Sequence, residues 1–180
     1  MTPRIETPRL ILRSHRLEDY ASCAQMWGDP AVTRFIGGRV STPQQTWSRV
    51  LAYRGHWALM GFGYWAIEEK ASREFAGEAG FADFKREIAA MHGVPELGFA
   101  LRPKFQGNGL CTEAVRAILA WGDDNLAATR TVCLIDEGNA ASIGVVTKFG
   151  YTAFGRTGLG AGTSLLFERP RPGTGASTSA

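Results

Sequence analysis

The spacing of hydrophobic positions predicts one strand and two helices in the first third of the chain. Residues 10–13 have the pattern of a short strand. The following residues change to helical spacing and place four side chains on one side, Leu17, Tyr20, Ala21 and Ala24, before Gly-Asp-Pro at 28–30 ends that helix. A longer helix is predicted from Pro43 to Met60, because Thr42 and Gln45 form a capping box and proline occupies the first helical position.

The middle and the end of the chain alternate between strand and helix patterns. Aromatic-rich runs at 61–69 and 73–84 predict two strands joined by a turn at 70–73, and a short strand is expected at 95–103 after a loop at 85–94. Helical spacing follows at 112–125 and 140–149, on either side of a β-prone run at 130–136. A last hairpin is predicted from segments 151–154 and 164–167. The order of seven strands and about four helices predicts a mixed α/β (α+β) domain with one central sheet.

Length and composition indicate a single domain that spans residues 1–169. The 180 residues are 44% hydrophobic, which is enough for one core. Residues 170–180 have nothing to bury and are expected to form a disordered tail. No run of about 18 apolar residues occurs, so we expect no membrane partner and a cytoplasmic location.

The net charge, the cysteines and the histidines limit which ligands, metals and compartments are expected. The net charge of +3 is spread along the chain without a basic run, which argues against nucleic-acid binding and is compatible with an anionic small ligand. The three cysteines are odd in number and far apart, which is typical of a reducing compartment. The histidines, His15, His56 and His92, lack ligand spacing and are expected at the surface, so no metal is predicted.

The stretch Gln106-Gly-Asn-Gly-Leu-Cys111 lies between a predicted strand and a predicted helix. Free amides at a helix N-terminus and the helix dipole favour an anion there, and a phosphate fits well. The stretch matches neither the Walker motif nor the dinucleotide fingerprint, because Thr112 stands where the latter needs a third glycine. From spacing alone, a glycine turn needed only for packing remains an equal alternative.

Five ordered segments between about Thr7 and Arg169 resemble the GNAT superfamily of acetyl-CoA-dependent N-acetyltransferases, in its branch of ribosomal-protein N-terminal acetyltransferases. These segments are TPRLILR, GDPAVTRFIGG, PELGFAL, the glycine stretch with the following CTEA, and NAASIGVVTKFGY. Gln106 and Gly109 match the pyrophosphate-loop pattern, while Cys111 replaces the usual glycine or alanine. The resemblance implies a single domain with a mostly antiparallel sheet that splays between its fourth and fifth strands.

The resemblance also implies acetyl-CoA as co-substrate and suggests how it is held. The pyrophosphate would lie on the main chain of Gln106, Gly107, Asn108, Gly109, Leu110 and Cys111, with Thr112 either reaching a phosphate or capping the helix. In the family a bulge in the fourth strand splays it from the fifth, and pantetheine would pair there with the exposed main chain of Phe99, Ala100 and Leu101. Asn139 would either hold pantetheine or cap the next helix.

Candidates for acid–base chemistry follow from the same alignment of motifs. Glu96 is the favoured general base, because strand alternation directs Glu96, Gly98 and Ala100 to the face opposite Leu97. Alternatives are a solvated Glu96 at the strand edge, or Glu78 on the preceding strand. Val146 stands where many relatives have a catalytic tyrosine, and Ser142 is the candidate donor to the departing sulfur.

The acceptor pocket of the family is built between the first two helices and before the fourth strand. Here the candidates are Trp27, Arg34, Phe35, Trp65 and Glu78. The acceptor itself is predicted only as a primary amine on a protein N-terminus or a small molecule. Homodimerisation through a sheet edge is common among relatives, without a direct sign in this sequence.

Two other classes of function remain open at this point. One is a CoA-binding sensor or partner protein that lost turnover, suggested by Val146 and Cys111. The other is a nucleotide-binding module that uses the same loop, for which a Walker lysine is lacking. Because Cys111 lies at a helix start, an acyl-cysteine intermediate is a further alternative, although no histidine is near Cys111 in sequence.

Overall fold

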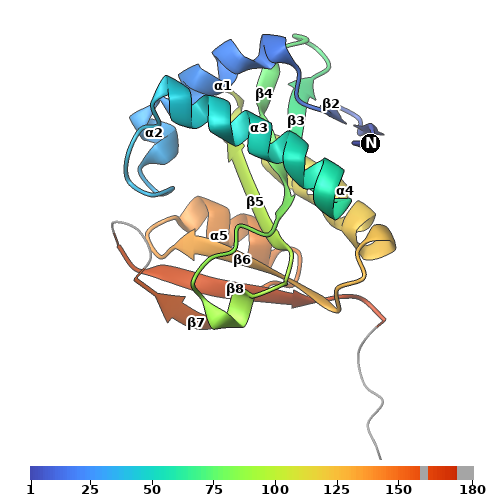
Figure 1. Ribbon diagram of the computed structural model, residues 1–180, viewed down its shortest axis with the longest axis vertical. Coiled ribbons are helices and arrows are strands. Elements are labelled where there is room, and N and C mark those ends of the chain that lie inside the picture. Colours follow the sequence, from blue (N-terminus) through green and yellow to red (C-terminus); the bar gives the residue numbers. More distant parts are fainter. Residues whose placement is uncertain (159–161, 174–180) are drawn as a thin grey trace, which may run out of the picture.

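A computed structural model of the chain describes residues 1–158 and 162–173 and contains one mixed α/β domain (Figure 1). Its strands are β1 (Ile5–Glu6), β2 (Leu10–Arg13), β3 (Tyr64–Glu69), β4 (Phe75–Ala82), β5 (Glu96–Leu101), β6 (Arg130–Asp136), β7 (Thr152–Thr157) and β8 (Ser164–Pro170). Its α-helices are α1 (Tyr20–Trp27), α2 (Pro30–Thr33), α3 (Pro43–Met60), α4 (Leu110–Asn125) and α5 (Ala140–Thr147). The class and the single sheet predicted from the sequence are confirmed, and β1 and α2 are additions.

The sheet consists of two antiparallel parts that meet at one parallel junction. The strand order is β1-β2-β3-β4-β5-β6-β8-β7, and β5 pairs with β6 at the single position Glu96–Val132. Beyond this position the two strands separate, so that β2–β5 with α1–α3 occupy one half and β6–β8 with α5 the other (Figure 1). The splay implied by the family resemblance is therefore present, although the pairing of β5 with β4 stays continuous and shows no bulge.

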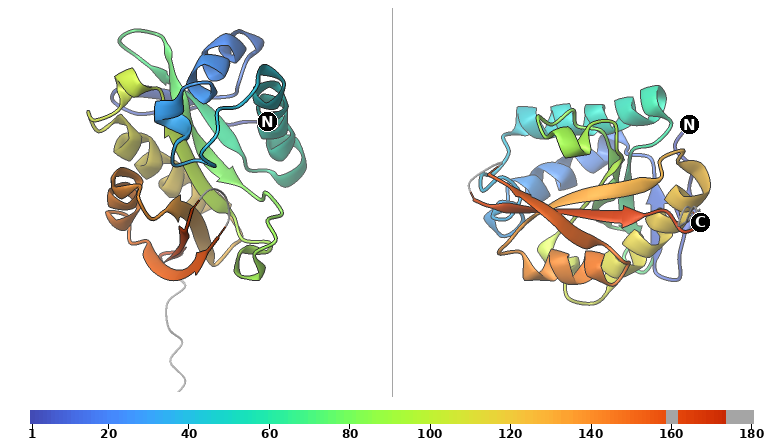
Figure 2. Two further views of the ribbon diagram at one scale, coloured as in Figure 1. Left: turned by 90° about the vertical axis from the view of Figure 1, so that its left-hand side faces the viewer. Right: turned by 90° about the horizontal axis from the view of Figure 1, so that it is seen from below.

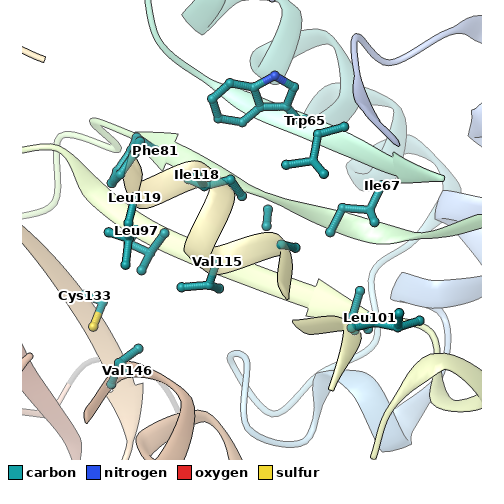
Figure 3. Close-up of a cluster of buried hydrophobic side chains, with 14 of the residues drawn as sticks. Trp65, Ile67, Phe81, Leu97, Leu101, Val115, Ile118, Leu119, Cys133 and Val146 are labelled. Carbon is teal, nitrogen blue, oxygen red and sulfur yellow. The ribbon is translucent and has the colours of Figure 1, made fainter. Parts of the chain in front are cut away.

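Helices cover both faces of the sheet, and the main core lies under α4. The view from below shows α3 on one side of the strands and α4 and α5 on the other (Figure 2). Side chains of α4 such as Val115, Ile118 and Leu119 point at the sheet, where they contact Phe81 and Leu97 (Figure 3). The alternation predicted for β5 is confirmed, because Leu97 and Leu101 belong to this core whereas Ala100 packs with residues of α1 and α3.

The long helix α3 begins and ends as predicted. The Thr42 side chain accepts from Gln45 N, and Gln45 returns a hydrogen bond to Thr42 N. The first helix differs from the prediction, since α1 buries Cys23, Met26 and Trp27 while Leu17 is 70% exposed. The expected apolar face was wrong because the polar side chain of Asp19 is drawn inward by Arg13.

Two boundaries of the second half also differ from the prediction. Helix α4 begins at Leu110 with Gly109 as N-cap, two residues before the predicted start, because glycine provides the left-handed φ of 83° that the cap adopts. Strand β8 continues through Pro170, and Arg171 N donates to Thr129 O at 2.8 Å. The expected tail therefore does not start at residue 170, and its part from 174 to 180 lies outside the described residues.

A buried ion cluster fastens β2 to the start of α1. Arg13 donates two hydrogen bonds to Asp19, at 2.7 and 2.8 Å, and one to Glu68 at 2.8 Å. Burial raises the pKa of Asp19, but hydrogen bonds from Arg13 and from Arg16 N outweigh it, and the net pKa is lowered. The Asp19 carboxylate thus contributes stability that is fully present above its unfolded pKa of about 4 and is lost as the pH falls through the lower folded value.

We predict that Asp19→Asn lowers the free energy of unfolding by about 3 kcal/mol, because it leaves the buried Arg13 with one carboxylate in place of two. Urea unfolding at pH 7 measures the loss, and the variant should also lack part of the decline that the parent shows below about pH 4. Glu6→Gln, in an exposed pair with Arg4, is the control and should leave the transition unchanged. An Asp19→Asn protein as stable as the parent would mean that Glu68 alone compensates Arg13.

Candidate active site

A cavity of about 440 Å³ lies where β5 and β6 separate. One wall comes from α1, the α2–α3 connection and α3, and the other from β6 and the start of α5. The lining includes Trp27, Phe35, Arg49, Tyr53, Tyr64, Arg86, Glu96, Phe99, Cys133, Asp136, Asn139 and Ser142. The splay of the sheet therefore joins elements that are far apart in sequence around one hollow.

The glycine loop is exposed and its glycines have the backbone that an open amide cradle needs. Gly107 and Gly109 have φ values of 80° and 83°, which side-chain-bearing residues rarely adopt. A Cβ at Gly107 would meet nothing within 4 Å, so this glycine serves backbone conformation and not close packing. Amides in the first turn of a helix lack intrahelical partners, which makes such an open helix start suited to an anion such as phosphate.

One side chain from outside the loop, Arg9, and one from within it, Gln106, hold the loop in place. Arg9 Nη1 donates to Asn108 O at 2.9 Å, and Arg9 Nε donates to Glu113 in the first turn of α4 at 2.7 Å. Gln106 Nε2 donates to Leu101 O at 2.7 Å, which ties the loop to the end of β5. Thr112 lies within the first turn of α4, so its alternative role as N-cap is excluded.

The edge of β5 that faces β6 offers main-chain groups beyond the junction. Val132 N donates to Pro95 O at 3.0 Å, and Arg102 N donates to Ala76 O at 2.9 Å. Because alternate residues of a strand direct their main-chain groups to opposite edges, Ala100 faces β4, whereas Phe99 and Leu101 face the gap. The prediction that the main chain of Ala100 is available to pantetheine is therefore wrong. The Leu101 carbonyl already accepts a hydrogen bond from Gln106.

Glu96 lines the cavity at the junction and is held by an arginine. Arg86 donates two hydrogen bonds to its carboxylate, at 2.7 and 2.9 Å. Only 6% of Glu96 is exposed, so the alternative of a solvated edge residue is wrong. Next to it, a Cβ at Gly98 would lie 1.9 Å from the Tyr64 hydroxyl, so glycine is needed for that hydroxyl to reach β5.

Glu78 is completely buried behind the cavity wall. Its Oε1 accepts from Trp27 Nε1 at 2.9 Å and from Tyr53 Oη at 2.7 Å. Burial raises the pKa of Tyr53 well above its usual value, and the negative charge of Glu78 adds to the shift, so Tyr53 remains a proton donor at neutral pH. Glu78 therefore reaches the cavity only through Tyr53 and Trp27.

The second oxygen of Glu78 faces two further buried side chains. His15 Nε2 lies 3.4 Å from Oε2 and Cys23 Sγ lies 3.9 Å from it. Within the described residues, this is the one group of three whose donor atoms are close enough to hold a metal ion. His15 is 5% exposed, which corrects the expectation that it lies at the surface, and the signal in the sequence was its place two residues after the buried strand β2.

The predicted acceptor residues separate into two groups. Trp27 and Phe35 line the cavity. Trp65 is fully buried in the main core, beside Ile67, and its Nε1 donates to Pro3 O, so it belongs to the opposite face of β3 (Figure 3). Arg34 is exposed, with its guanidinium 4.3 Å from the Phe35 ring centre, and does not line the cavity.

Ser142 and Asn139 reach the cavity from the start of α5. Asn139 Oδ1 accepts from Ser142 N at 3.1 Å and so caps this helix. Val146 lies one turn further and is fully buried in the core beside Cys133 (Figure 3). Within α5, Ser142 is thus the hydroxyl group that lines the cavity.

The two cysteines near the site are poor nucleophiles. Burial raises the pKa of Cys111 to about 12, and it also raises the pKa of Cys133. Both thiols stay protonated at neutral pH, which argues against an acyl-cysteine intermediate.

Several cavity residues carry no motif that sequence reasoning could have used. Tyr53 and Tyr64 stack with ring centres 4.3 Å apart, and Arg49 lies over the Trp27 ring at 3.9 Å. Arg49 and Tyr53 are one helical turn apart on α3, a spacing that could have identified them as a pair on one face.

Known proteins resemble this chain over most of its length. The family described as "Acetyltransferase (GNAT) domain" matches residues 9–152. Curated relatives include YkkB of Bacillus subtilis, an uncharacterized protein 30% identical over 82% of this chain and 84% of its own, and the uncharacterized N-acetyltransferase YoaA of the same organism, 26% identical over 84% of both chains.

Solved structures have the same fold. A GnaT-family protein from Bordetella pertussis superposes with a TM-score of 0.81 at 28% identity, covering 93% of this chain and 99% of its own. RimL, described as a ribosomal L7/L12 alpha-N-protein acetyltransferase in complex with coenzyme A, gives a TM-score of 0.76 at 18% identity, with 93% and 98% covered, and this likeness concerns the fold alone. The chain therefore belongs to the GNAT acetyltransferase family and is an acyltransferase.

Proposed function

We propose that this protein transfers the acetyl group of acetyl-CoA directly to a primary amine bound in the cavity between β5 and β6. The proposal rests on one observation. The free edge of β5 leads from the open loop at 106–111 to the cavity. A phosphate-bearing ligand on the loop would extend along Phe99 into the hollow that contains Glu96 and Ser142. Acetyl-CoA supplies a thioester whose acetyl carbon accepts the amine.

The residues around the cavity support a division of roles. Glu96 is proposed as the general base that takes a proton from the acceptor ammonium, directly or through water, and Arg86 positions its carboxylate. Ser142 is proposed to donate a hydrogen bond to the sulfur as the carbon–sulfur bond breaks.

The acceptor remains a primary amine on a small molecule or a protein N-terminus. The RimL relative acts on a ribosomal protein, as its description says, and this is compatible with a protein acceptor here. Every helix among the described residues is too short or too polar to span a membrane.

We predict that Gly109→Trp weakens the binding of CoA and acetyl-CoA about 100-fold, because it distorts the left-handed cap and covers the amides that would hold the pyrophosphate. Isothermal titration measures the dissociation constant. Gly93→Trp is a matched control, since Gly93 also has positive φ, 69°, with open space around it, but lies in the 85–94 loop. Equal affinity of parent and Gly109→Trp would show that the loop is a packing turn.

We predict that Glu96→Gln lowers kcat about 100- to 10,000-fold while the dissociation constant for CoA stays unchanged, because only proton removal is lost. Steady-state assays of free thiol with a panel of amines give the rate. Glu78→Gln tests the alternative base, for which Tyr53 would have to pass the proton. A large loss in Glu78→Gln with a small loss in Glu96→Gln would assign the base to Glu78.

Ser142→Ala should lower kcat about 100-fold, as expected for removing one donor to a developing charge, with little change in KM for acetyl-CoA. Thr147→Ala on the same helix is the control, because its hydroxyl donates to Ile143 O and does not line the cavity. A parent protein that binds CoA but acetylates no amine would favour the alternative of a CoA sensor.

A further inference from the structure

Arg49 is half-buried and, unlike Arg13, Arg86 and Arg169, lacks a carboxylate partner in the described part of the chain. Arg13, Arg86 and Arg169 each hold an acidic side chain through two parallel hydrogen bonds or more. Among the described residues, no carboxylate oxygen lies within 4.0 Å of the Arg49 guanidinium, and its buried Nε has no hydrogen-bond partner. A half-buried cation whose Nε is withdrawn from water and whose charge is unpaired is costly, so its presence in a cavity wall needs an explanation.

The surroundings of Arg49 fix its position without neutralising it. Its guanidinium lies flat over Trp27, 3.9 Å from the ring centre, and Tyr53 follows one turn later on α3. Burial lowers the pKa of Arg49, but the neighbouring Tyr53, which also forms a hydrogen bond with it, and the Glu78 charge raise it more, and the group stays a cation. Glu78 itself already accepts hydrogen bonds from Trp27, Tyr53 and Cys23.

The remaining charges of the cavity leave Arg49 free for a ligand. Arg86 and Glu96 neutralise each other at the junction. Asp136 lies at the end of β6, where its Oδ1 accepts from Gly138 N at 2.8 Å. The wall formed by α1 and α3 therefore presents one cation beside aromatic rings, in the space where the acceptor would bind.

We propose that Arg49 binds a carboxylate of the acceptor, so that the substrates of this enzyme are amines that carry a carboxylate near the amino group. This inference rests on the proposed acetyl transfer and adds its substrate class. A guanidinium binds a carboxylate through two parallel hydrogen bonds, and stacking on Trp27 holds it ready to do so. The carboxylate belongs either to an amino acid or to an acidic side chain at a peptide N-terminus.

The test compares pairs of amines that differ only in the carboxylate. Phenylalanine is matched with phenethylamine, and the amidated peptide Asp-Ala-Ala with Asn-Ala-Ala. Binding is titrated calorimetrically with and without CoA, and acetylation is measured separately. The parent should prefer the carboxylate-bearing member of at least one pair about 10- to 100-fold, as expected for a charge-assisted hydrogen-bonded pair. The pair that shows the preference identifies the source of the carboxylate.

Arg49→Gln should abolish this preference, and Arg49→Lys should keep only part of it, because lysine retains the charge without the planar fork. Arg34→Gln is the matched control, since Arg34 also lies over an aromatic ring but outside the cavity. Unchanged CoA affinity shows that each variant is folded.

Equal binding of the members of both pairs, a preference that persists in Arg49→Gln, or no binding of any carboxylate-bearing amine would overturn the proposal. Failure of the proposed function has a different signature, which is the absence of acetyl transfer to every amine, neutral ones included. The binding preference is measurable in that case as well.

Discussion

The separation of β5 from β6 is the constraint on which the rest of the structure depends. Two sheet halves joined at one backbone position, Glu96–Val132, leave the main chain of Phe99 facing a gap. That gap is the cavity, which Asn139 and Ser142 border at the start of α5, while the glycine loop follows the far end of β5. Because β5 and β6 separate, main-chain groups at this edge of β5 have no partner strand among the described residues. A ligand lying in the gap would supply the missing hydrogen bonds.

Polar groups buried on one face of β4 and β5 give the cavity its chemistry. The face under α4 is apolar, with Phe81, Leu97 and Leu101. The opposite face carries Glu78 and Glu96, each held by named donors from helices or loops. Strand alternation separates the two functions, because neighbouring residues of one strand serve the core and the site in turn.

Charge is distributed unevenly around this site. Arg86 is neutralised by Glu96, whereas Arg49 rests on Trp27 and has its nearest acidic group, Glu78, behind the wall. The cavity therefore combines a neutral junction, where acetyl transfer would occur, with a cationic wall. In the proposed reaction this asymmetry would orient the acceptor, with its amine toward Glu96 and an anionic group toward α3.

Local patterns in the sequence determined the elements, and only the tertiary structure decided which side chains meet. The capping box of α3, the alternation of β5 and the glycine loop depend on residues within a few positions, so they could be predicted. Ala100, Trp65 and His15 were misjudged because strand pairing and helix docking, which join distant segments, set their surroundings. Arg49 and Tyr53 could not be identified for the same reason: their significance comes from Trp27 and Glu78, which lie 22 or more residues away and become neighbours only when α1 and α3 pack on the sheet.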